Sequence, residues 1–321
     1  MSACRGTARA IEVGAGAEDF ALQPNGPRGP RLLIAALRRP AGKEPGTLWS
    51  VDLMGATQEQ PQQLVIPKDV FPAGMALAER DGRTWLYFTN LPPNAPPSIE
   101  LFELNGEDLA WSESFTDARL TMPNDLAVTA GGDFYVTDMG LPRNALLRAI
   151  VALSPVRTGT VLHFDVATRN WTEFARKLAM PNGIAIDRSD RYVFVNEFAA
   201  KRLRIFNRAT GEEALDSHVE FDGYPDNLQW ETPQILDVAL HVSKLRIGLH
   251  LKRRKTTSPS RGSRVDLREF LENGAAPSVE LLYDFRDFNG GSSALVYQTS
   301  LYVSQVCENK VLVVDDCEPL H

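Results

Sequence analysis

The sequence predicts an all-β fold, a single six-bladed β-propeller domain over residues 1–321, and two observations indicate it. First, one motif recurs: a proline, then oxygen-bearing side chains, then an apolar run typical of a strand. Its three copies are Pro123-Asn124-Asp125, Pro181-Asn182-Gly183 and Pro225-Asp226-Asn227, whose asparagines stand 58 and 45 residues apart. Those spacings are close to the roughly 40 to 50 residues of a four-stranded blade. Second, short alternating apolar runs between turn residues are typical of antiparallel strands.

The units follow one another along the chain. The first contains strand-like runs at residues 32–37 and 47–53, and the second begins at Pro72 with the proline of the motif but without its asparagine. Units three, four and five begin at the three motif prolines. The last unit begins at Gly290-Gly291-Ser292 and should close the ring. Counted in this way, the chain has six units.

Two segments interrupt this pattern. Residues 142–153 carry apolar side chains near helical spacing and are followed by Ser154-Pro155, which predicts a helix. We expect it on one end of the ring, either as a lid over a central pocket or as a plain surface helix. Residues 252–261 are basic and serine-rich, which predicts a solvated loop, with a binding patch for an acidic partner as the alternative.

Composition limits the classes of function. A net charge of −7 argues against a general nucleic-acid surface. No apolar run of about 18 residues is present, so no membrane span is predicted. The N-terminal stretch lacks the apolar core of a signal peptide, which predicts a cytoplasmic protein. The oligomeric state cannot be predicted from these features.

Three cysteines are too few for a disulfide framework. Cys4 lies near the start of the chain and Cys317 near its end, and a circular fold brings the two ends together. A bridge between them would lock the ring and leaves export open. Free thiols in a reducing compartment are the alternative. Cys307 lies in a strand pattern and is expected to be buried.

The motif side chains indicate a metal. Strands that begin at the central channel would bring Asn124, Asn182, Asp226 and Asn227 together at its mouth. Calcium takes about 6 to 8 oxygen ligands and accepts amide carbonyls, whereas zinc prefers cysteine and histidine clusters that this chain lacks. Glu18 would add a second carboxylate. A single motif would favour an ordinary turn, and it is the three copies in repeat register that favour a metal site.

The whole chain resembles the paraoxonase/arylesterase group of six-bladed, calcium-dependent lactonases. It is more distantly similar to gluconolactonases and strictosidine-synthase-like propellers. The residues that carry the resemblance are Glu18-Asp19, Pro72-Ala73-Gly74-Met75, Pro123-Asn124-Asp125, Asn182-Gly183-Ile184 through Val195-Asn196-Glu197, and Asp226-Asn227.

The resemblance implies two calcium ions, one catalytic and one structural. The residues that match the ligands of the catalytic ion are Glu18, Asn124, Asn182, Asp226 and Asn227. Those that match the deeper, structural ion are Asp19, Asp125 and the backbone carbonyl of Met75. The resemblance also favours the Cys4–Cys317 bridge.

The chain departs from the family at one point. Vertebrate paraoxonases have a histidine pair implicated in activating water, and Ala73 and Leu91 stand at those places here. We therefore expect Asp226 to be the general base, with Glu18 or His241 as alternatives. A lone histidine after an apolar strand, such as His241, is also commonly structural.

The predicted function is calcium-dependent hydrolysis of a small-molecule lactone or aryl ester. In this hypothesis water attacks a carbonyl polarised by the metal. A non-hydrolytic cyclase or isomerase on the same scaffold is one alternative. A calcium-stabilised binding module is the other, because a fold does not determine a function.

Overall fold

The computed structural model describes residue 4 and residues 6–37, 44–55, 58–142, 144, 157–215, 218–253 and 256–318, most of them in strands. The strands of the first half are β1 (Ala8–Glu12), β2 (Ala17–Gly26), β3 (Gly29–Ala36), β4 (Thr47–Asp52), β5 (Pro61–Gln63), β6 (Pro72–Arg80), β7 (Arg83–Asn90), β8 (Ser98–Asn105), β9 (Asp108–Phe115), β10 (Pro123–Val128), β11 (Phe134–Asp138) and β12 (Gly159–Asp165). Those of the second half are β13 (Asn170–Leu178), β14 (Pro181–Ile186), β15 (Tyr192–Glu197), β16 (Arg202–Asn207), β17 (Val219–Glu220), β18 (Tyr224–Thr232), β19 (Ile235–His241), β20 (Pro259–Asp266), β21 (Ser278–Asn289), β22 (Gly291–Tyr297), β23 (Ser300–Gln305) and β24 (Lys310–Val314). The helices are η1 (Phe198–Ala200), α2 (Lys244–Arg253) and α3 (Arg268–Asn273).

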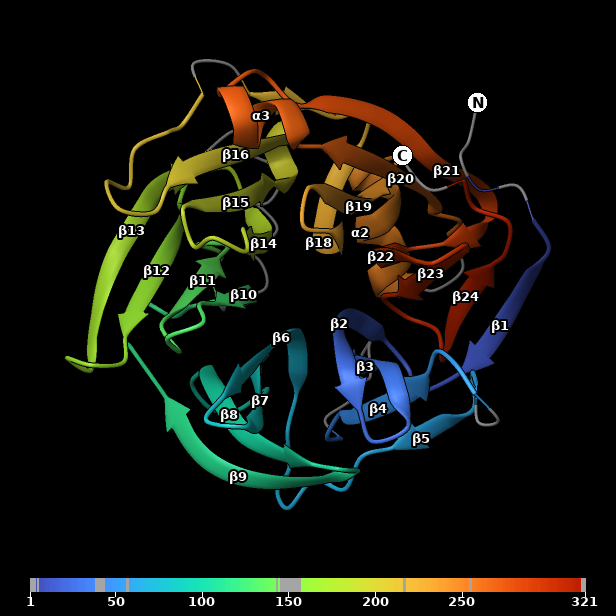
Figure 1. Cartoon of the computed structure of the whole chain (residues 1–321), viewed down its shortest axis with the longest axis horizontal. Helices are drawn as coiled ribbons and strands as arrows, with labels where there is room; N and C mark the ends of the chain where they lie inside the picture. Colours follow the sequence, from blue (N-terminus) through green and yellow to red (C-terminus); the bar gives the residue numbers. More distant parts are fainter. Residues whose placement is uncertain are drawn as a thin grey trace.

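The sheets stand around a common axis like the blades of a propeller (Figure 1). Four of them have four strands each, in sequence order: β6 to β9, β10 to β13, β14 to β17 and β18 to β21. In each of these sheets the first strand lies nearest the axis (Figure 1). The predicted all-β propeller is therefore confirmed.

The remaining sheet has eight strands, in the order β1-β24-β23-β2-β3-β4-β5, with β22 also paired to β23. A single residue pair, Ala17 with Gln305, joins β2 to β23. We interpret this sheet as two blades, one made of β2 to β5 and one of β22 to β24 with β1. On that interpretation the ring has six blades, and the count itself stays a prediction because the sheet is continuous.

Both ends of the chain meet in one blade. β1 pairs with β24, with Ala8 opposite Val314, so the first strand completes the sheet that contains the last. A disulfide between Cys4 and Cys317 joins the same ends across a sequence separation of 313. The bridge that the sequence left open is therefore present, and Cys307 is buried as expected.

Every innermost strand has an irregular register near its start. The shift lies between Pro72 and Met75 in β6, and β2, β10, β14, β18 and β22 have it at the equivalent place. The residues inside each shift leave the regular ladder, as in a β-bulge. They are the residues that follow the motif prolines, so the repeat seen in the sequence is a repeat of bulges.

Two bulges require glycine because the next blade lies against them. A Cβ on Gly74 would be 2.4 Å from Cα of Asp125, and a Cβ on Gly183 would be 2.6 Å from the carbonyl oxygen of Asp226. Backbone cannot withdraw as a flexible side chain can, so any larger residue would push the blades apart. Neighbouring blades therefore touch through their backbones close to the axis.

Apolar side chains fill the space between neighbouring sheets. One cluster combines Leu126 of β10 and Phe134 of β11 with Tyr87 and Ile99 of the preceding sheet. Ring contacts such as Phe134 with Phe164, at 5.0 Å between centroids, extend it outward along the blade. No helix among the described residues is long and apolar enough to span a membrane.

The helices differ from expectation. α2 and α3 lie at opposite ends of β20, so they lie on opposite faces of the ring. The prediction of a solvated loop over 252–261 is wrong, because α2 runs to Arg253 and β20 begins at Pro259. Ser258 and Ser260 are buried. The backbone N–H of Ser258 donates to the side chain of Asn289, and Ser260 pairs with His241 across the strands. The predicted lid helix over 142–153 lies, apart from residues 142 and 144, outside the described residues.

Loss of the disulfide should destabilise the protein. A Cys4→Ala/Cys317→Ala double variant should lose about 2 to 5 kcal/mol, because the bridge closes a very long loop. Guanidinium unfolding with and without reductant measures this. The wild type should respond to reductant and the double variant should not; a wild type indifferent to reductant contradicts the prediction.

Thr137 should stabilise the contact between two blades. Its Oγ1 accepts a hydrogen bond from the backbone N–H of Asp125 (3.1 Å) and donates one to the carbonyl of Asn182 (2.6 Å). Thr137→Val keeps the shape, removes both bonds and should cost about 1 to 3 kcal/mol in urea unfolding. Thr232→Val, at an exposed position, is the control. Equal midpoints for the two variants would refute this role.

Candidate active site in the central channel

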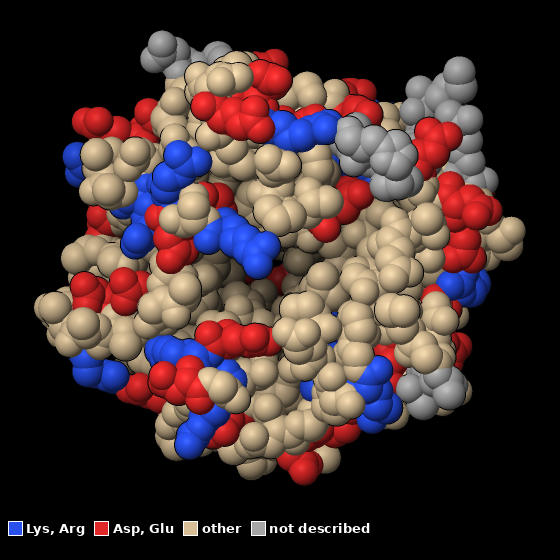
Figure 2. Space-filling model, viewed as in Figure 1, with Lys and Arg blue, Asp and Glu red and all other residues tan. Residues whose placement is uncertain are grey.

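Six residues occupy equivalent bulge positions on the innermost strands and surround the axis. We call them the ring residues: Glu18, Ala73, Asn124, Asn182, Asp226 and Ser292. None is more than 8% exposed. Figure 2 shows that the molecule is hollowed at the centre of one face, with acidic and basic side chains interspersed around the hollow. Buried polar groups such as these need partners.

Side chains of other blades fix the backbone of this ring. Four ring residues have a backbone carbonyl oxygen that accepts a hydrogen bond from a buried side chain of another blade. The pairs, donor first, are Thr89 Oγ1 to Asn124 (2.9 Å), Thr137 Oγ1 to Asn182 (2.6 Å), Asn196 Nδ2 to Asp226 (2.7 Å) and Asn227 Nδ2 to Glu18 (3.0 Å). The first three bonds join adjacent blades, and the fourth joins the blade of β18 to that of β2 across the blade of β22. Together they hold the bulges at fixed positions.

Asp226 is in contact with His241. Nε2 of His241 lies 2.7 Å from Oδ2 of Asp226, and Ser292 Oγ donates to the same oxygen at 3.1 Å. An ionised carboxylate only accepts, so Nε2 must carry the proton between them. In the neutral imidazole, Nδ1 of His241 then holds a lone pair, and no described residue hydrogen-bonds it. No described residue hydrogen-bonds Oδ1 of Asp226 either.

Two asparagine oxygens of the channel lack protein partners. Oδ1 of Asn182 and Oδ1 of Asn227 are buried and accept no hydrogen bond from the described part of the chain. The amide nitrogen of Asn227 donates to the carbonyl of Glu18. The amide oxygen of Asn227 is therefore the group without a partner among the described residues. A buried acceptor without a partner costs about 1 to 3 kcal/mol. Both oxygens therefore indicate a ligand that attracts lone pairs.

The residues next to the ring form a second, deeper layer. Asp19 Oδ2 accepts a hydrogen bond from the backbone N–H of Met75 (2.9 Å), which places the backbone of Met75 beside that carboxylate. Asp125 Oδ2 accepts one from the backbone N–H of Ile184 (2.9 Å). The carboxylate of Asp19 thus links the blade of β2 to that of β6, and the carboxylate of Asp125 links the blade of β10 to that of β14.

Burial perturbs both deep carboxylates. It raises the pKa of Asp19 to about 7, and the charge of Glu18 adds to the effect. Burial also raises the pKa of Asp125 well above its usual range, and the charges of Asp19 and Asp226 raise it further. Carboxylates from different blades therefore repel one another here, and a bound cation would relieve the repulsion.

A second circle of residues, the rim residues, lies at the end of the second strand of each blade. They are Leu37, Leu91, Met139, Phe198, His241 and Val306. The backbone N–H of the five apolar members bonds the carbonyl just before the innermost strand, and His241 pairs with Tyr224 at the same place. His241 thus occupies a position that is apolar in the other blades, for example Leu91 in the blade of β6 to β9.

This arrangement bears on the missing histidine pair. Ala73 is a ring residue and Leu91 is the rim residue of the same blade, so neither brings an ionisable group to the channel. The chain has an imidazole at the rim of the blade that contains Asp226 instead. The contact with Asp226 places the imidazole of His241 beside a ring carboxylate.

Sequence reasoning missed three polar residues of the site. Ser292 contacts Asp226, while Ser293 Oγ and Gln229 Nε2 each donate to Oδ1 of Asp19 at 3.0 Å. The last unit has glycine in place of the motif proline and serines in place of asparagine, so it does not match by letter. Its place in the repeat was the available signal.

The donor set fits calcium. Among the described residues no group of three or more His, Cys, Asp or Glu side chains forms a metal cluster. The channel instead offers the carboxylates of Glu18 and Asp226 with the amide oxygens of Asn124, Asn182 and Asn227. An all-oxygen set that includes neutral amides suits calcium, and two carboxylates balance its charge.

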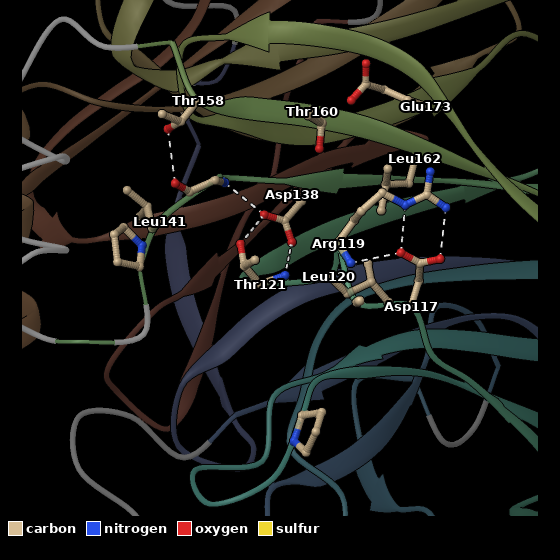
Figure 3. A pocket seen from close by; sticks show the side chains of 14 residues that line it. Asp117, Arg119, Leu120, Thr121, Asp138, Leu141, Thr158, Thr160, Leu162 and Glu173 are labelled. Carbon is tan, nitrogen blue, oxygen red and sulfur yellow. Dashed lines mark hydrogen bonds and ion pairs between the residues drawn. The ribbon is translucent and has the colours of Figure 1, made fainter.

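A hollow of about 690 Å³ lies at the blade of β10 to β13 (Figure 3). Residues of β11, β12 and β13 and of the segment before β10 line it, and it contains no ring residue. Its charged groups are already paired: Asp117 with Arg119, and Asp138 with the backbone N–H groups of Thr121 and Gly140. We therefore place the site in the channel.

The model of the arylesterase family matches residues 12–314. Serum paraoxonase/lactonase 3 of Homo sapiens is 26% identical over 210 residues, which cover 61% of this chain and 57% of that protein. Its counterpart in Oryctolagus cuniculus is 22% identical over 307 residues, 91% of this chain and 83% of that protein. The match to the human protein thus spans little more than half its length.

Solved structures share the fold. A gluconolactonase from Xanthomonas campestris superposes with a TM-score of 0.59 and 14% identity, covering 98% of this chain and 91% of that one. A luciferin-regenerating enzyme gives a TM-score of 0.59 and 14% identity, covering 96% and 95%. At this identity the likeness shows the propeller fold alone.

Proposed function

Because the chain belongs to the arylesterase family, we propose that it hydrolyses small-molecule lactones or aryl esters in a calcium-dependent reaction at the ring residues. The carrying observation is the state of Asp226. Its Oδ2 is occupied by His241 and Ser292, and no described residue hydrogen-bonds its Oδ1. A carboxylate held on one side and open on the other is suited to accept a proton.

The proposed metal ligands are the residues that the sequence analysis predicts. One ion would be held by the oxygens of Glu18, Asn124, Asn182, Asp226 and Asn227. A second would lie deeper, between Asp19 and Asp125 and near the carbonyl of Met75. The partnerless amide oxygens and the raised pKa values of the deep carboxylates support this assignment. Calcium at the ring would supply a Lewis acid toward the carbonyl oxygen of the substrate.

The chain's own residues would manage the proton. Asp226 Oδ1 accepts a proton from the attacking water, whose oxygen bonds to the carbonyl carbon. The carbon–oxygen bond to the leaving group then breaks, and the proton passes from Asp226 to the departing alkoxide of a lactone or phenoxide of an aryl ester. The products are a hydroxy acid from a lactone, or a carboxylic acid and a phenol from an aryl ester. His241 Nε2–H stays on Oδ2 and holds the carboxylate in place.

Glu18 and His241 are the alternative bases. Glu18 is buried at the ring, so it is close enough to the axis to act on water. His241 has a lone pair at Nδ1, but that atom is buried, whereas its other nitrogen is committed to Asp226. Asp226 therefore remains the preferred base.

The apolar rim favours esters with an apolar body. Phe198 packs with Ile247 of α2, Val306 and Cys307 in one buried cluster beside the mouth of the channel. The ring of Phe198 also lies 6.0 Å from that of His241, between centroids. An apolar acyl chain or aryl group would displace water here at little cost.

Turnover should depend on calcium. A panel of lactones and aryl esters should be hydrolysed by the purified protein, lose turnover by at least about a hundredfold after chelation, and regain it with calcium, because the ring stabilises charge only when loaded. Full turnover in protein shown to be metal-free would contradict the calcium requirement. Tightly bound calcium without turnover of any ester would favour a cyclase, an isomerase or a binding module.

Removing the charge of Asp226 should abolish the reaction. Asp226→Asn should lower kcat by about 10² to 10⁴, the usual contribution of a general base. Asp222→Asn is the matched control, because the Asp222 side chain is 93% exposed and pairs only with Arg261 among the described cations. An Asp226→Asn protein with wild-type esterase activity would refute Asp226 as the base.

A further inference from the structure

Ser292 is a buried hydroxyl for which the proposed reaction has not so far required a role. It is the ring residue of β22, it is 0% exposed, and it lies in the blade next to the one that contains Asp226. Its Oγ donates to Oδ2 of Asp226 at 3.1 Å. The bond crosses the boundary between two blades close to the axis.

The carboxylate of Asp226 can only accept, so Ser292 is the donor of this bond, and a contact with Asn227 agrees with that direction. Nδ2 of Asn227 approaches Oγ of Ser292 at 3.5 Å, while donating its stronger bond to the carbonyl of Glu18 at 3.0 Å. An amide nitrogen can only donate, so it takes a lone pair of the serine oxygen. The hydroxyl proton is left to point at Asp226.

Two donors therefore converge on one carboxylate oxygen. His241, from the same blade as Asp226, and Ser292, from the next, both bond Oδ2. With one donor the carboxylate keeps the freedom to turn about its terminal torsion, which is broad for aspartate. With two donors in different directions on the same oxygen, one orientation is preferred.

We propose that Ser292 is a positioning residue for Asp226, which it holds with Oδ1 presented to the channel. The inference rests on the proposed function, in which Oδ1 takes the proton and the carboxylate of Asp226 helps to hold calcium. It assigns to the sixth blade a share in a site whose recognised motif residues lie in other blades.

Ser292→Ala tests the proposal on turnover. Loss of a hydrogen bond to a charged group should lower kcat by about tenfold or more, with KM within about threefold, because the substrate-binding surface is unchanged. Ser292→Thr keeps the hydroxyl and should restore kcat to within about threefold of wild type. A loss that Ser292→Thr does not reverse would overturn the role of the hydroxyl.

A matched control separates positioning from packing. Ser50 is 1% exposed, and its Oγ donates to Oε2 of Glu107 in the neighbouring blade at 2.8 Å, away from the ring residues. Ser50→Ala removes the same kind of bond, so it should lower the unfolding midpoint comparably and leave kcat unchanged. If Ser292→Ala does not fold, Ser292→Cys keeps the volume while weakening the donor and should show the same fall in kcat.

Calcium titration gives a readout that needs no substrate. Ser292→Ala should bind calcium several-fold more weakly than wild type, while Ser50→Ala should match wild type, because only the former frees the carboxylate of Asp226. A wild type that binds calcium but hydrolyses no ester overturns the proposed function, and this titration still decides the role of Ser292. Wild-type kcat and calcium affinity in Ser292→Ala would overturn the positioning role alone.

Discussion

The hydrogen bonds from buried side chains to the backbone carbonyls of the ring residues are the interaction on which the site depends. A bulge takes residues out of the sheet ladder, so their polar backbone groups need other partners. Thr137 and Asn196 provide such partners for Asn182 and Asp226 from the preceding blade. The same bonds that join the blades therefore fix the backbone from which the channel side chains extend. Stability and site geometry share one set of contacts.

The channel concentrates polar groups inside a molecule whose blades are joined by apolar side chains. Burial raises the pKa of Asp125, and the charge of Asp19, which is far away in sequence, raises it further. The protein offsets this partly with donors such as the N–H groups of Met75 and Ile184. It leaves Oδ1 of Asn182 without a partner among the described residues. A calcium ion would satisfy both the excess negative charge and the unused oxygen.

The sequence predicted the propeller and indicated equivalent positions for Asn124, Asn182 and Asp226, because each directly follows a proline of the repeated motif. It missed Ser292, since glycine and serine there do not repeat the motif by letter, and it missed Thr137, which resembles any threonine in a strand. The pairing of His241 with Asp226 depends on cross-strand register, which a sequence does not display. The buried Ser258 was hidden among basic residues that indicate a surface loop.

The most direct test of a calcium site in the channel is a crystal structure grown with calcium and measured for the anomalous signal of the ion. The account predicts an ion within about 2.3 to 2.6 Å of the side-chain oxygens of Glu18, Asn124, Asn182, Asp226 and Asn227, and a second between Asp19 and Asp125. A channel without metal at millimolar calcium, with water or a protein donor on Oδ1 of Asn182 and Asn227, would contradict it.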